Sequence, residues 1–180
     1  MVAPVSVDEF WDVARGLERA ELVGGQVVEL VPPGFRHGEI AATISHLLHE
    51  YITRRGLGAV VGETGFILSR DPATVRAPDV AVVLSARVPA PRPVRFFPGP
   101  PDLAVEVLSP DDRPGEVAAK VADYIRAGTQ AVWVVDPDAE TVTVHSRDQA
   151  IRYGENELVD GAPVLPGFHP AVRDLLGVSS

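Results

Sequence analysis

Two acidic residues stand in apolar segments where carboxylates are seldom found. Asp79 opens the apolar run 79–84, and Glu106 lies inside the apolar run 103–108. A buried carboxylate costs free energy unless it is paired, hydrogen-bonded or bound to a metal ion. Each acid therefore needs a partner. A basic side chain or a group of backbone N–H donors would give an ordinary structural pair, whereas a shared divalent cation would give a site.

The candidate cationic partner is Lys120, the only lysine in a chain that otherwise uses arginine for positive charge. A lysine amine is a compact charge that can orient a water molecule or a phosphate oxygen, whereas arginine presents a planar fork. At about 100° per residue, Lys120 falls at the edge of the apolar stripe of its helix and could reach a strand end. Two alternatives stay open: a lysine kept by chance, and a surface pair with Glu116.

The absence of cysteine limits the chemistry that the chain can support. Disulfides, thiolate zinc sites and cysteine nucleophiles are excluded, so a bound metal must take oxygen or imidazole ligands. The zinc motif HExxH is also absent, because Gly38 follows His37. His37 itself begins a predicted helix, where it could contact a phosphate or an acidic ligand or act as a structural cap.

An arginine-containing segment, 85–101, has six prolines and no acidic residue. Its side chains of interest are Arg87, Arg92, Arg95, Phe96 and Phe97. The arginines could bind phosphates and the phenylalanines could stack on bases. Such a segment is more often a proline-rich surface loop, and that interpretation also stays open. Glu21, Glu29 and Glu63 could add a carboxylate behind the metal ligands, but they are expected to lie at the surface.

Composition indicates one ordinary globular domain covering residues 1–180. Hydrophobic residues make up 46% and charged residues 23% of the 180 residues, which is typical of a folded α/β protein of this length. No apolar stretch reaches the roughly 18 residues of a membrane span, and residues 1–11 lack a signal-peptide pattern. A cytoplasmic protein without a membrane partner is expected. The net charge of −9 counts against binding to nucleic acid.

Local signals predict the elements that would position these residues. Ser6 and Glu9 predict the start of a short helix, and Gly24-Gly25 predicts a hairpin between strands 21–23 and 26–30. Apolar spacing predicts an amphipathic helix over 37–53 that ends at Gly56.

The second half of the chain alternates apolar strands with a helix. Strands are predicted at 79–84, 103–108 and 131–135, the last forming a hairpin with 141–145. Asp111 or Asp112 is expected to cap the intervening helix, with Pro114 in its first turn and Gly128 at its end. This order predicts a mixed sheet with helices on its faces.

Several segments together resemble the bacterial Uma-two family, long filed as a domain of unknown function and labelled restriction-endonuclease-like. The segments are AELVGG (20–25), PGFRHG (33–38), APDV (77–80), PDLAVEVLSP (101–110), VWVVDP (132–137) and LPGF (165–168). The resemblance covers about residues 5–176. It implies the PD-(D/E)xK nuclease fold, an α/β fold whose restriction-endonuclease-like mixed β-sheet core is flanked by helices, with an N-terminal β-hairpin.

The resemblance also implies a site and an activity. Asp79 and Glu106, with the carbonyl of Val107, would hold Mg²⁺ or Mn²⁺, and Lys120 would position the nucleophile. One departure matters: Leu108 stands where these folds usually carry lysine, so Lys120 would supply the amine from a migrated position.

A metal-dependent endonuclease acting on DNA is the function that follows. A homodimer is expected only by analogy with related nuclease folds. The alternative is a catalytically inactive binding or assembly module that keeps the fold and uses Glu106 and Lys120 as a buried ion pair.

Overall fold

The computed structural model describes residues 3–177. Its elements, in chain order, are α1 (Val7–Ala14), β1 (Ala20–Val23), β2 (Gln26–Glu29), α2 (Phe35–Arg55), β3 (Gly58–Gly62), β4 (Phe66–Arg70), β5 (Ala73–Arg76), β6 (Val80–Leu84), the 3₁₀ helix η1 (Ser85–Arg87), β7 (Leu103–Val107), α3 (Pro114–Ala127), β8 (Ala131–Asp136), β9 (Thr141–His145), β10 (Ala150–Gly154) and α4 (Val172–Leu175). No helix in this range is both long and apolar enough to cross a membrane.

Short-range signals set the ends of several elements as predicted. Ser6 and Glu9 form a reciprocal capping box at the start of α1, which satisfies backbone N–H groups that a helix start leaves free. Gly24 and Gly25 turn between β1 and β2 with φ of 58° and 79°, a conformation that glycine adopts without strain. Gly56 ends α2 in the left-handed conformation.

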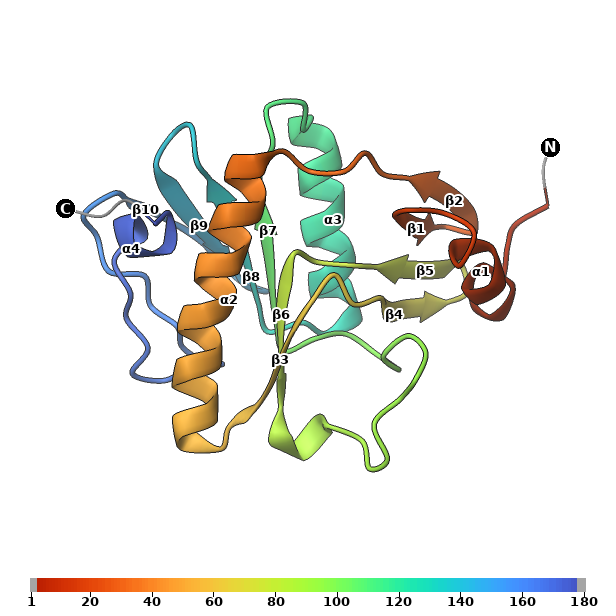
Figure 1. Ribbon diagram of the computed structural model, residues 1–180, viewed down its shortest axis with the longest axis horizontal. Helices are drawn as coiled ribbons and strands as arrows, with labels where there is room; N and C mark the ends of the chain where they lie inside the picture. Colours follow the sequence, from red (N-terminus) through yellow and green to blue (C-terminus); the bar gives the residue numbers. More distant parts are fainter. Residues whose placement is uncertain (1–2, 178–180) are drawn as a thin grey trace.

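The larger sheet carries the main core. Its strand order is β10-β9-β8-β7-β6-β3, and β7 pairs with β8 in parallel while the other neighbours are antiparallel. Alternate residues of β6 and β7 point to opposite faces. Val82 and Val105 pack against Ile44 of α2 on one face, whereas Ala104 packs against Tyr124 of α3 on the other. The mixed sheet between helices confirms the predicted α/β class (Figure 1).

A smaller antiparallel sheet lies beside the large one, with the order β2-β1-β5-β4. Phe10 of α1 packs on Leu22 and Val75 of this sheet, and Leu68 of β4 contributes to the cluster beneath α3. The smaller sheet therefore contacts α3 through β4. This second sheet is what brings the start of the chain to the end of β7.

The prediction that Asp111 or Asp112 caps α3 was wrong. The residue that precedes the first turn of α3 is Arg113, and the Asp112 carboxylate instead accepts a hydrogen bond from Ser109 N at 2.7 Å. The aspartate thus stabilises the loop before the helix. The prediction failed because Asp can accept N–H bonds in a turn as well as at a helix start.

The phenylalanines of segment 85–101 are not free to stack on bases. Phe97 is buried, pairs with Phe66 through an isolated β-bridge and packs on its ring. Phe96 stacks on Phe10 with ring centroids 5.4 Å apart. These two aromatic side chains tie the segment to both sheets, so the base-stacking interpretation is wrong for them.

Candidate functional site

Strand register brings the two acids to one edge of the large sheet. Val80 of β6 pairs with Val105 of β7, so Asp79, one residue before β6, lies across from Glu106 near the end of β7. Val107 N donates a hydrogen bond of 2.8 Å to Asp79 Oδ2. This bond continues the strand pairing through a side chain and fixes the position of the Asp79 carboxylate.

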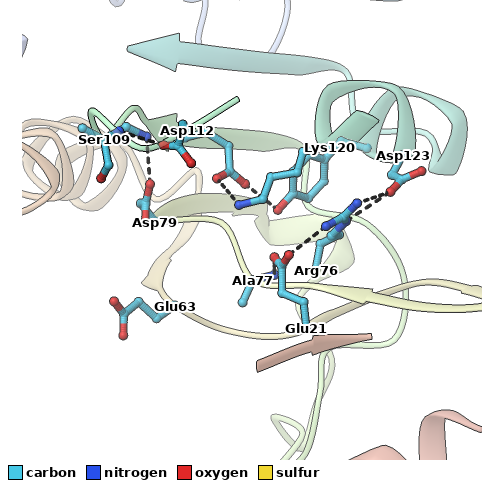
Figure 2. Close-up of polar contacts among 12 residues, drawn as sticks. Glu21, Glu63, Arg76, Ala77, Asp79, Ser109, Asp112, Lys120 and Asp123 are labelled. Carbon is cyan, nitrogen blue, oxygen red and sulfur yellow. Dashed lines mark hydrogen bonds and ion pairs between the residues drawn. The ribbon is translucent and has the colours of Figure 1, made fainter. Parts of the chain in front are cut away.

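Glu106 points to the face of the sheet that α3 covers. Tyr124 Oη donates to Glu106 Oε1 at 2.9 Å, and Lys120 Nζ donates to Oε2 at 3.1 Å. Lys120 and Tyr124 are four residues apart, so they lie on the same side of α3. Figure 2 shows the Lys120 side chain reaching from α3 toward the sheet. The alternative pair of Lys120 with Glu116 is not what the structure shows, because Glu116 contacts Arg113 instead.

Asp79 is surrounded by groups from three other segments. Besides Val107 N, its Oδ2 lies 3.2 Å from His37 Nε2 in the first turn of α2. Its Oδ1 lies 3.6 Å from Arg19 Nη2, which also lies 3.4 Å from Glu63 Oε1. The Asp79 side chain is only 8% exposed. Asp79 is therefore a buried acid that contacts an arginine, a histidine and one backbone N–H.

Glu21 corrects an expectation, because it is buried and not at the surface. Its residue is 1% exposed, its Oε1 accepts from Ala77 N at 3.0 Å and its Oε2 accepts from Arg76 Nη1 at 2.8 Å. Arg76 Nη2 in turn lies 2.7 Å from Asp123 Oδ2 on α3. Figure 2 shows this chain of ion pairs next to Lys120. Glu63, by contrast, is exposed as expected.

These groups line a pocket of about 530 Å³. Its inner wall includes Arg19, His37, Asp79, Glu106, Val107 and Lys120. Its rim is acidic and includes Glu29, Asp111, Asp112 and Glu116. The pocket therefore combines buried acids and bases inside with negative charge at the mouth.

The pKa values of Glu106 and Lys120 are both raised, although burial acts on them in opposite directions. Burial raises the pKa of Glu106 to about 7, and Asp79 and Glu21 add to that increase, while Lys120 opposes it. For Lys120, burial acts to lower the pKa, but Glu106 and Glu21 outweigh it and the net shift is upward. The carboxylate of Glu106 thus lacks enough positive charge around it, and a further cation in the pocket would favour its ionised form.

The pKa of His37 is raised as well. The hydrogen bond to Asp79 is the largest cause, burial opposes it, and the Val107 backbone makes a smaller upward contribution. The ring therefore lies next to both the acid and the backbone of the end of β7.

The residues fit a hydrated divalent cation, but not a complete protein cage. As the side chains stand in residues 3–177, no group of three or more His, Asp or Glu residues is arranged to hold a metal ion. Two carboxylates and a carbonyl are nevertheless the oxygen donors that Mg²⁺ accepts, and Mg²⁺ normally keeps several waters. The raised pKa of buried Glu106 is the observation that favours such a cation.

The arginines of segment 85–101 are not brought to this pocket. Arg87 pairs with Asp102 at 3.0 Å and donates to Pro100 O at 2.7 Å. Arg92 and Arg95 line a separate apolar hollow of about 190 Å³. Because the segment joins the end of β6 to the start of β7, it lies at the opposite end of these strands from Asp79 and Glu106 (Figure 1).

The sequence interpretation missed several residues of the site. Tyr124 was not singled out as a site residue, although its position four residues after Lys120 was a usable signal. Arg19, Arg76 and Asp123 gave no comparable signal, because each reaches the site through contacts between segments far apart in the chain.

Comparisons with known proteins identify the family and the fold. Residues 7–175 match the model of the Uma-two family, described as "Putative restriction endonuclease". A crystal structure of a protein from Anabaena variabilis, described as a "putative nuclease", superimposes with a TM-score of 0.83 at 22% sequence identity, covering 97% of this chain and 98% of the other. At that identity the likeness establishes the fold. No curated protein matches the sequence.

Proposed function

The chain belongs to the Uma-two family, as its sequence resemblance predicted, and from its nuclease-like fold and pocket we propose that it is a metal-dependent endonuclease that hydrolyses phosphodiester bonds in DNA. One observation carries the proposal. Asp79, Glu106 and Lys120 come from three separate segments of the chain and meet at one pocket, with the amine 3.1 Å from the second acid.

In this proposal Asp79 and Glu106, with the carbonyl of Val107, hold Mg²⁺ or Mn²⁺. Bound there, the cation would polarise a phosphoryl oxygen and lower the pKa of a bound water. The protein orients the ligands beforehand: Val107 N fixes the Asp79 carboxylate, and Tyr124 fixes the Glu106 carboxylate. Lys120 is placed to hold the attacking water or a phosphate oxygen.

Cleavage of supercoiled plasmid by the purified protein tests the proposal. With Mg²⁺ or Mn²⁺ we expect nicked and linear products, and with EDTA none. Asp79→Asn, Glu106→Gln and Lys120→Ala should each lower the rate by about 100-fold or more, the usual loss when one group acting on the transition state is removed.

The matched control is Asp8→Asn, which changes an exposed acid on α1 that does not line the pocket. This variant should cleave at the rate of the wild type. Equal nicking by wild type and Lys120→Ala would identify a contaminating nuclease and contradict the proposal.

A second candidate function is a non-catalytic binding or assembly module. It is favoured by the contacts of Glu106, since both of its oxygens already have protein partners, and by Leu108 at the usual lysine position. This candidate predicts no thermal stabilisation by Mg²⁺ or Mn²⁺, whereas a protein that binds the ion only when folded is stabilised by it. Differential scanning fluorimetry with and without each ion separates the two.

A further inference from the structure

The His37 side chain lines the pocket from the start of α2. It lies in the first turn of α2, and its side chain is only 10% exposed. Nε2 lies 3.2 Å from Asp79 Oδ2, while Nδ1 is buried without a hydrogen-bond partner among residues 3–177. Of the two ring nitrogens, Nε2 is therefore the one that faces the Asp79 carboxylate in the pocket.

We infer that His37 is a ligand of the divalent cation, coordinating it through Nε2 beside the Asp79 carboxylate. This inference rests on the metal site of the proposed function and adds a nitrogen donor to it. The donor set becomes Asp79, Glu106, His37 and the carbonyl of Val107, completed by water.

The spacing of the two side chains supports this assignment. Neighbouring ligands of an octahedral ion with bonds of about 2.0–2.1 Å lie about 3 Å apart. The separation of 3.2 Å between His37 Nε2 and Asp79 Oδ2 therefore suits two adjacent positions on one cation. In that arrangement the contact between the two residues is replaced by two bonds to the metal ion.

Glu106 would join the same cation in one of two ways. Its oxygens accept hydrogen bonds from Lys120 and Tyr124, so it either binds through a water molecule or turns one oxygen away from Lys120. Both are compatible with an ion that keeps part of its hydration shell.

A nitrogen ligand changes which metal the site prefers. Mg²⁺ takes oxygen ligands, whereas transition metals accept imidazole as well. We therefore expect Mn²⁺ to bind more tightly than Mg²⁺. The His37→Gln variant should bind Mn²⁺ about tenfold or more weakly while its Mg²⁺ affinity changes less, as isothermal titration calorimetry can measure.

Pulsed electron paramagnetic resonance of Mn²⁺ bound to the full chain is the direct test, because it detects nitrogen next to the ion without relying on activity. Wild type should show ¹⁴N modulation, and labelling with ¹⁵N-histidine should alter it. His37→Gln should abolish it. The matched control His49→Gln, an exposed residue of the same helix, should leave it unchanged.

The outcomes separate this inference from the proposed function. Bound Mn²⁺ with no response to ¹⁵N-histidine, or full ¹⁴N modulation in folded His37→Gln, would overturn the His37 assignment and leave the oxygen site standing. Failure of the wild type to bind any Mn²⁺ would overturn both. The labelled wild type makes the result independent of whether a variant folds.

Discussion

Glu106 is hydrogen-bonded by its neighbours, yet burial disfavours its ionised form. Tyr124 and Lys120 donate to its two oxygens, yet the pKa of Glu106 is raised to about 7 because burial outweighs the attraction of the lysine. Removing charges from water is costly even when they are paired. The Glu106–Lys120 ion pair therefore adds little to the stability of the fold. A further cation next to it would favour the ionised form of Glu106.

Glu106 predicts a pH dependence of stability for the protein in EDTA. Its folded pKa of about 7 exceeds the ordinary value of 4.5, so the folded state binds this proton more tightly than the unfolded state does. The contribution of Glu106 is complete below about pH 4.5 and is lost as the pH rises through about 7. Thermal unfolding in EDTA should reveal this loss as a decrease in Tm between these pH values.

Glu106→Gln should flatten that part of the Tm profile, since the amide does not titrate. Glu116→Gln, an exposed acid on α3, should keep the wild-type slope. Addition of Mn²⁺ should also reduce the slope if the ion binds the ionised carboxylate. Identical slopes for wild type and Glu106→Gln would show that burial does not raise the pKa in this way.

At the scale of elements, the site depends on one arginine that joins three segments. Arg76 at the end of β5 contacts Glu21 of β1 and Asp123 of α3, while Glu21 also accepts from Ala77 N. This network connects the smaller sheet to the helix that carries Lys120. The position of Lys120 over Glu106 thus depends on a contact that lies outside the pocket.

We predict that Arg76→Met lowers the free energy of unfolding by about 3–5 kcal/mol, the usual loss when one partner of a buried ion pair is removed. The reason is that Glu21, which is 1% exposed, would keep a buried charge without its guanidinium. Urea unfolding measures the change, and the double variant Glu21→Gln with Arg76→Met should recover part of it.

The comparison is Arg54→Met, which breaks an exposed pair with Glu50 on α2. Exposed pairs contribute less than about 1 kcal/mol, so this variant should be nearly as stable as the wild type. Similar losses in Arg54→Met and Arg76→Met would refute the buried network as a structural connection.

Considered as a whole molecule, the protein carries a net charge of −9 and an acidic rim around its pocket. Such a surface does not attract a polyanion over a distance. Contact with a phosphate backbone would be confined to the pocket, whose cationic side chains are Arg19 and Lys120. A substrate would be held by a few close contacts and by the metal, not by a broad basic surface.

This charge distribution predicts a weak salt dependence of DNA binding. With at most two phosphate contacts, the slope of log K against log salt should be no steeper than about −2. Fluorescence anisotropy with Ca²⁺ in place of Mg²⁺, over a series of KCl concentrations, provides the slope. Arg92→Gln and Arg95→Gln should leave it unchanged, because these residues lie away from the pocket. A slope of about −6 or steeper would indicate an additional basic surface.

Sequence alone determined the features that depend on residues close together in the chain. The capping box of Ser6 and Glu9, the turn at Gly24-Gly25 and the end of α2 at Gly56 were all predicted. Each is decided by hydrogen bonds or backbone angles within a few residues. Two acids in apolar strands could also be recognised as needing partners, because the cost of burying a charge does not depend on the fold.

Tertiary structure decided which partners those acids have. The register of β6 against β7 places Asp79 across from Glu106, and the packing of α2 brings His37 to the same acid. Glu21 was wrongly expected at the surface, because only the contact of β1 with β5 and the position of α3 bury it. Such contacts join residues tens of positions apart, and no local propensity encodes which surfaces meet.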